Sequence, residues 1–206
     1  MMRYFVQVLL LALFVGGCSL TTTVPAAAKY MLSADVEIAG EKESLYSDKV
    51  VRMGEMESPA ILAARTIYYK TDEGRSYTYT KARWMESVPQ QLSKLMMLSI
   101  TKSQLFKDVI PFRSLAKNDL IFESSLYEIS QTIHDDGTST LLLSMKVRLV
   151  EQYSRKIIAT HLFELKKEGV PGDAEGAVKG YSEMTQELLL AIDTWLKQSC
   201  KRSDSN

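Results

Sequence analysis

The chain has 206 residues, in which 25 lysines and arginines balance 25 aspartates and glutamates. This neutral balance, with no long basic run after the N-terminal segment, argues against nucleic acid as a partner. The two cysteines are too few for a disulfide scaffold, so the fold must depend on a hydrophobic core.

Residues 1–17 have the layout of an export signal, with Arg3 followed by an apolar run over residues 4–15. An apolar run of about a dozen residues is too short for a permanent membrane helix, which needs roughly 20. The sequence Val-Gly-Gly-Cys that ends at Cys18 resembles the bacterial lipobox. We therefore predict a lipoprotein that is cleaved after Gly17 and lipidated on Cys18, with palmitate among the acyl chains. The alternative is an ordinary secretory signal.

The residue types around Cys18 suit membrane anchoring. A thiol supplies the nucleophilic sulfur that accepts diacylglycerol, and each buried methylene contributes about 0.8 kcal/mol, so two or three chains hold a protein on a membrane. Ser19, in place of aspartate, resembles outer-membrane sorting. We predict a location on the periplasmic face of the outer membrane. A thioether at Cys18 leaves Cys200 as a lone thiol, and the sequence does not assign a role to it.

The rest of the chain divides into a tether, one domain and a tail. Residues 18–29 have no amphipathic period and are predicted to be a lipidated tether, which spans at most about 35 Å when fully extended. Residues 30–200 form a single domain, and residues 201–206 are a polar tail. A first short strand is expected over residues 29–32.

Alternating apolar residues indicate strands in the next part of the chain. Ile61, Ala63, Ile67 and Tyr69 are expected on one face of a strand, followed by a turn at 71–74 and a returning strand. The later expected elements comprise a second hairpin, a further strand and two amphipathic helices. These are a helix over 88–105, strands over 120–133 and 138–149 joined at 135–137, a strand over 156–165, and a helix over 173–198.

Consecutive hairpins favour a largely antiparallel sheet. The two helices each carry an apolar stripe, and two such helices cannot bury both stripes on each other and leave the sheet bare. Pro89 suits the first turn of the first helix, and Asp173 is a suitable N-cap for the second. The predicted fold class is therefore α+β, with both helices packed on one face of the sheet.

A catalytic or metal site is hard to assemble from this sequence. The only histidines are His134, which is expected in a solvated loop, and His161, which is expected on a sheet face. Two such histidines without a cysteine ligand pair do not make a zinc site. The run Gly180–Met184 lacks the closing glycine of a nucleophile elbow and lies in a predicted helix. We predict no enzyme activity, no metal and no cofactor.

Aromatic residues concentrate in one stretch, where Tyr68, Tyr69, Tyr77 and Tyr79 precede Trp84. One interpretation is that they pack between the sheet and the first helix. The other is an exposed anchor for a protein partner, because tyrosine, tryptophan and arginine are favoured at binding hot spots. Tyr79, Arg83 and Trp84 are therefore candidates for a partner-binding or structural motif.

Six short motifs together resemble the family of auxiliary lipoproteins of ABC-type transport systems, which includes the PqiC-like intermembrane-transport lipoproteins. The motifs are Tyr30-Met31-Leu32, Ile67-Tyr68-Tyr69, Tyr77-Thr78-Tyr79, Ala82-Arg83-Trp84, Pro89 and Phe106-Lys107-Asp108-Val109. They cover most of the predicted domain. Relatives often have alanine after the Arg-Trp pair, where this chain has Met85.

The resemblance implies a fold similar to the N-terminal domain of TolB. It also implies a non-catalytic component of an MCE/ABC-type lipid-transport system, which docks an MCE-domain ring to the outer membrane. The partners would be the MCE-domain protein, its permease and the membrane, and self-association into a homo-oligomer stays open. The alternatives are a periplasmic lipid-binding carrier and an outer-membrane assembly lipoprotein.

Overall fold

The computed structural model describes residues 26–35, 37–41 and 44–201, so the predictions for Gly17, Cys18 and most of the tether lie outside the described residues. The described part contains an eight-stranded mixed sheet, one short 3-10 helix and two α-helices. The elements, in chain order, are β1 (Ala28–Tyr30), β2 (Val50–Met53), η1 (Ala60–Ala63), β3 (Thr66–Thr71), β4 (Ser76–Trp84), α2 (Val88–Ser103), β5 (Asp108–Ile110), β6 (Leu120–Ile133), β7 (Thr138–Glu151), β8 (Ile157–Pro171) and α3 (Ala174–Ser199).

The longest strands form an antiparallel meander, as the alternating pattern predicted. Strand β6 pairs with β7 from Leu120↔Glu151 to Ile133↔Ser139, and β7 pairs in turn with β8. The turn between β6 and β7 contains Gly137 at φ 82°, a conformation that glycine adopts without steric cost. The long hairpin was predictable because a strictly alternating pattern and a turn signal agree there.

The other edge of β6 is divided between two partners, and this makes the sheet mixed. The N-terminal end of β6 pairs in parallel with β2, and its C-terminal end pairs in parallel with β3 through Lys70↔Thr132 and Thr71↔Ile133. Strand β4 then pairs antiparallel with β3 and parallel with β1, while β5 lies beyond β2. The prediction of a largely antiparallel α+β sheet is confirmed, with parallel pairs added at its margins.

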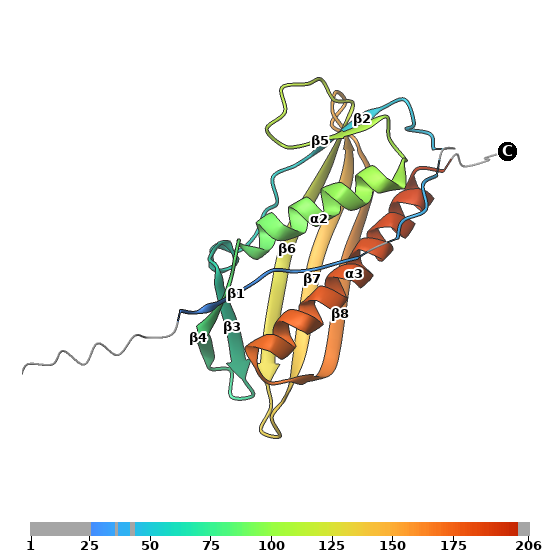
Figure 1. Cartoon of the computed structure of the whole chain (residues 1–206). Coiled ribbons are helices and arrows are strands. Elements are labelled where there is room, and N and C mark those ends of the chain that lie inside the picture. The colour runs from blue at the N-terminus through green and yellow to red at the C-terminus, as the bar shows by residue number, and fades with distance from the viewer. Residues whose placement is uncertain (1–25, 36, 42–43, 202–206) are drawn as a thin grey trace, which may run out of the picture.

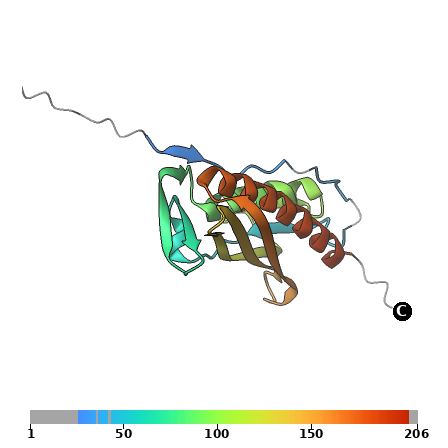
Figure 2. The ribbon, with the colours of Figure 1, turned by 90° about the horizontal axis from the view of Figure 1, so that it is seen from below.

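Both α-helices cover the same face of the sheet (Figure 1), and the view from below shows them side by side on it (Figure 2). Helix α2 has Pro89 in its first turn, where the missing N–H costs no intrahelical hydrogen bond. Helix α3 is capped by Asp173, whose carboxylate accepts a hydrogen bond from the Gly176 N–H at 2.7 Å. Both helix starts agree with the sequence signals.

The core lies between the helices and the inner face of the sheet. Strand β7 contributes five inward side chains, each at most 1% exposed, which are Leu141, Leu143, Met145, Val147 and Leu149. Helix α3 approaches β7 closely at Gly180, where an added Cβ would lie 2.4 Å from the Cδ1 atom of Leu141. Neither α2 nor α3 covers the opposite face of the three long strands (Figure 1, Figure 2), so no helix of the described residues lies on that face.

Two sequence predictions need correction. Ile61 and Ala63 lie in η1 and not in a strand, because the chain leaves a bridge between Glu57 and Ser125 and must turn at Pro59 before β3 begins. Strand β8 continues to Pro171 instead of ending near residue 165. Its last part carries Lys and Glu side chains, and an exposed edge strand tolerates such charges.

Candidate functional site

The β3–β4 hairpin brings the predicted tyrosines together. The ring of Tyr69 stacks on Tyr77 at a centroid distance of 5.5 Å and meets Tyr79 at 4.8 Å. The Tyr79 hydroxyl donates a hydrogen bond to the Oε1 atom of Gln131 at 3.0 Å. Burial, with a smaller contribution from Asp173, raises the pKa of Tyr79 to about 12, so this phenol stays protonated. The cluster therefore joins β4 to the central strand β6.

Strand alternation separates the Arg-Trp pair. The Trp84 side chain is 3% exposed in the core, and its ring lies 6.4 Å from that of Tyr181 on α3. Arg83 is exposed and lies on the opposite face of β4. Tyr79 packs partly buried against the core. Of the three candidates, Arg83 is thus the one that a partner reaches without unfolding the domain.

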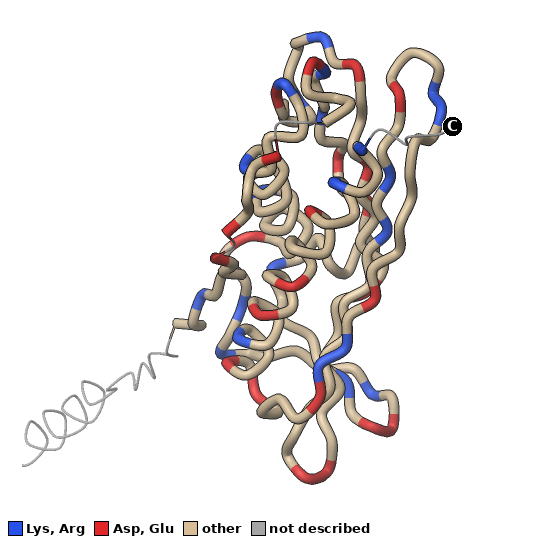
Figure 3. Tube along the Cα trace, turned by 90° about the vertical axis from the view of Figure 1, so that its right-hand side faces the viewer, with Lys and Arg blue, Asp and Glu red and all other residues tan. Residues whose placement is uncertain are grey.

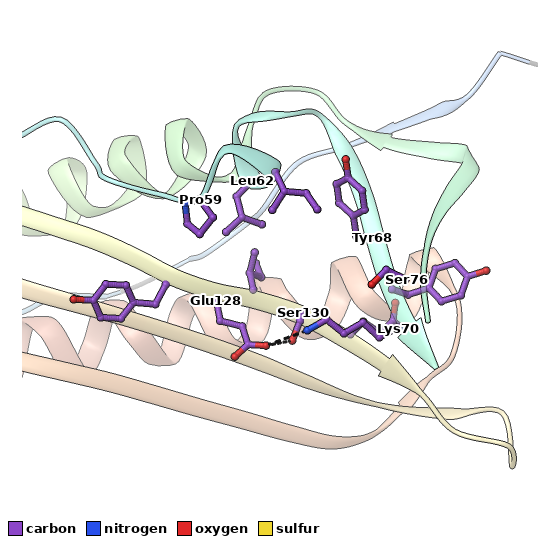
Figure 4. Close-up of a pocket in the computed structure, with 12 residues that line it drawn as sticks. Pro59, Leu62, Tyr68, Lys70, Ser76, Glu128 and Ser130 are labelled. Atoms are coloured by element: carbon purple, nitrogen blue, oxygen red, sulfur yellow. Dashed lines mark hydrogen bonds and ion pairs between the residues drawn. The ribbon is translucent and has the colours of Figure 1, made fainter. Parts of the chain in front are cut away.

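A pocket of about 230 Å³ opens between β3, η1 and the middle of β6. Figure 4 shows Pro59, Leu62 and Tyr68 facing Glu128 and Ser130 across this space. Most of the lining side chains are apolar or aromatic. The lining residues are Pro59, Ile61, Leu62, Tyr68, Tyr69, Lys70, Ser76, Tyr127, Glu128, Ile129, Ser130 and Gln131.

The rim of the pocket carries one opposite-charge pair. The Lys70 Nζ atom lies 3.6 Å from the Glu128 Oε1 atom, and the Ser130 hydroxyl donates a hydrogen bond to the same carboxylate oxygen at 2.6 Å. Both charged side chains are partly exposed, so their mutual attraction adds little to stability. The pair instead offers one cation and one anion beside an apolar pocket.

The pocket lies beside an irregular part of β6. The pairing of β6 with β7 shifts register between Leu126 and Glu128, so Tyr127 is an extra, bulged residue and is 51% exposed. On the other edge of β6, the Leu126 N–H donates to the Glu57 carbonyl at 2.8 Å, and the next described strand pairing is at Thr132. The intervening edge lines the pocket instead of pairing with a strand of the described chain.

Sequence reasoning missed the contribution of Tyr127, Glu128 and Ile129. The buried positions of this strand are the even numbers from Leu120 to Leu126, together with Ser125, and then Gln131. The sequence carries part of this change, because the apolar residues Leu120, Phe122 and Leu126 are followed by Ile129 and Ile133. A change of parity within one strand is the sequence trace of a bulge, and bulges concentrate beside functional sites.

The two histidines have structural surroundings. His134 lies next to the β6–β7 turn, and its Nδ1 and Nε2 atoms lie 2.8 Å from Asp72 and Thr140 oxygens, which ties the two hairpin tips together. His161 on β8 packs against Phe163 at a ring distance of 4.4 Å. Across residues 26–35, 37–41 and 44–201, no three His, Cys, Asp or Glu side chains are grouped to hold a metal ion.

Cys200 lies at the C-terminal end of α3. Its side chain is fully buried, and this burial raises the pKa of the thiol to about 12. A buried, protonated thiol is a poor nucleophile. Cys200 is therefore a packing residue in the folded protein.

The fold matches solved structures. A crystal structure of a Xanthomonas campestris protein superposes with a TM-score of 0.71 at 10% identity, covering 84% of this chain and 96% of that one. A crystal structure of an uncharacterized protein superposes with a TM-score of 0.57 at 17% identity, covering 83% and 99%. At these identities the likeness concerns the fold alone. No curated protein matches the sequence.

A model of the family described as the ABC-type transport auxiliary lipoprotein component matches residues 30–193. The chain belongs to this family. As an auxiliary lipoprotein, it is assigned to the cell envelope and to an ABC-type transport system, and the auxiliary role implies a non-enzymatic protein. Neither α2 nor α3, the helices of the described part, is long and apolar enough to cross a membrane.

Proposed function

We propose that this auxiliary lipoprotein docks the ring of an MCE/ABC-type intermembrane lipid-transport system to the periplasmic face of the outer membrane. In this function the acyl chains on Cys18 hold the protein on the membrane, and the folded domain binds the MCE-domain protein. Membership of the transport family and the residue Ser19 after the lipidated cysteine support the proposal.

The observation that carries the binding function is the pocket beside the bulge in β6. An apolar cavity of about 150 Å³ is enough to hold a benzene ring, so 230 Å³ has room for one large side chain of a partner. Apolar and aromatic walls suit such an anchor residue. The charged rim formed by Lys70 and Glu128 sets the orientation of the partner's polar groups.

A lipid-carrier function is less well supported by this cavity. Pockets that enclose drug-sized ligands have volumes of about 300–1,000 Å³, and a phospholipid is at least that large. The pocket of 230 Å³ is below this range. A protein side chain is therefore the better occupant.

We expect Ile61→Asp and Tyr127→Asp each to weaken binding to the MCE-domain partner about tenfold or more, which is about 1.4 kcal/mol. Both side chains line the pocket and are about half exposed, so an aspartate there places a charge at the contact without disturbing the core. Binding is measured with the lipidated full-length protein and its MCE-domain partner in mild detergent.

Leu115→Asp is the matched control, because Leu115 is fully exposed in the loop between β5 and β6 and lines no part of this pocket. It should bind like the wild type. Equal affinity in all three variants would exclude the pocket as the docking site. Phospholipid that co-purifies with the wild type and is lost in the pocket variants would support the carrier function instead.

A further inference from the structure

The first strand and the fourth strand place two cations side by side. Strand β1 runs parallel to β4 with Lys29↔Arg83 and Tyr30↔Trp84 as paired residues. Trp84 points into the core, so the alternation of side chains sends Lys29 and Arg83 to the opposite, outer face. Both side chains are exposed.

These two cations have no ion-pair partner among the residues that the structure describes. Glu86, three residues after Arg83, is engaged elsewhere because it pairs with Lys94. Neighbouring strands lie about 4.8 Å apart, so the two like charges repel each other. An external anion would relieve this repulsion.

Two exposed methionines follow the cations. The Met85 N–H donates to the Tyr30 carbonyl at 2.8 Å, so the β1–β4 pairing continues one step beyond the strands. Met31 and Met85 are 50% and 44% exposed. A row of cations beside a row of apolar side chains is the pattern of surfaces that rest at the headgroup level of a membrane. We call these four residues, Lys29, Arg83, Met31 and Met85, the basal patch.

The position of the basal patch in the chain also points to a membrane. Ala28, the first residue of β1, follows Cys18 by ten residues, and ten extended residues span at most about 35 Å. Figure 3 shows basic positions beside the place where the described chain begins. Lys29 and Met31 thus lie close along the chain to the predicted acyl anchor, and the pairing of β1 with β4 places Arg83 and Met85 beside them.

We propose that the basal patch lies on the membrane surface, where Lys29 and Arg83 bind the phosphates of anionic phospholipids and the two methionines enter the interface. Cations near an anionic bilayer surface are attracted within roughly a Debye length. The acyl chains keep the patch within reach of that surface, so even a weak interaction fixes the orientation of the domain. The inference needs the acyl anchor and does not need the transport ring.

The test uses the lipidated full-length protein, reconstituted in vesicles of phosphatidylethanolamine with about 30% phosphatidylglycerol. A fluorophore is attached at Met85→Cys, since Cys200 is buried and its raised thiol pKa makes it a poor competitor for the label. We expect lipids with a nitroxide near the headgroup to quench this probe at least twofold more than a probe at Leu115→Cys. Lys29→Glu with Arg83→Glu should abolish the difference, as should vesicles of phosphatidylcholine alone.

The matched control is Arg113→Glu with Lys117→Glu, which makes the same change of charge at two exposed positions near Leu115. This control should leave the quenching at Met85→Cys unchanged. Equal quenching at the two probe positions would overturn the inference. Unchanged quenching in the Lys29→Glu/Arg83→Glu variant would also overturn it. If that variant kept the quenching and lost binding to the MCE-domain protein, the basal patch would be a protein contact. The vesicles contain no MCE-domain protein, so a failure of the proposed docking function does not affect this result.

Discussion

Replacing Trp84 with alanine is expected to lower the free energy of unfolding by about 3–5 kcal/mol. The side chain of Trp84 is 3% exposed and packs against Tyr181 of α3. The backbone of Trp84 pairs with Tyr30 of β1, and its N–H donates to the Arg65 carbonyl at 2.7 Å. Alanine would leave a cavity where the sheet meets α3. For a domain of this size, the melting temperature should fall by roughly 10 °C. The measurement is thermal unfolding of the lipidated protein in mild detergent, followed by circular dichroism.

Trp195→Ala is the matched control, because Trp195 is the other tryptophan of the chain and is only partly buried beside Phe122. Its unfolding free energy should fall by a smaller amount. If Trp84→Ala kept the wild-type melting temperature and instead lost partner binding, Trp84 would be an interface anchor and the packing explanation would be wrong.

The sequence predicted the helices and the long hairpins because each depends on local information. A run of alternating residues, the turn at Gly137 and the cap at Asp173 each specify an element without reference to distant residues. The short strands β2 and β5, with four and three residues, are too short for any period to appear. Their pairing is determined by distant parts of the chain.

The pocket and the basal patch depend on contacts that no local pattern contains. The pocket requires η1 and β3 to meet the bulge at Tyr127, far apart in the sequence. The patch requires the parallel register that sets Lys29 against Arg83. The Arg-Trp motif itself was visible in the sequence, but which of its two side chains points into the core follows only from knowing which face of β4 is buried.

Release from the membrane is expected to leave binding to the MCE-domain partner intact and to abolish transport. The comparison uses the lipidated protein and the domain from Lys29 onward behind a cleavable, non-lipidating signal, expressed at equal levels in a deletion strain. Binding should survive because the pocket residues all lie within the folded domain. Transport should fail because the anchor determines where the complex meets the membrane and raises the local concentration of the domain there. The released domain should therefore restore no resistance to detergents in the deletion strain.

Pull-down with the MCE-domain protein reports binding, and resistance to detergents reports envelope function. Cys18→Ala in the full-length chain is the control for lipidation, and metabolic labelling with palmitate should disappear in this variant because the acceptor sulfur is missing. Palmitate labelling that persisted would contradict lipidation at Cys18. Full rescue by the unlipidated domain, with palmitate labelling absent, would show that tethering is dispensable. It would support the lipid-carrier function, because a docking protein acts only where its anchor holds it, whereas a soluble carrier acts throughout the periplasm.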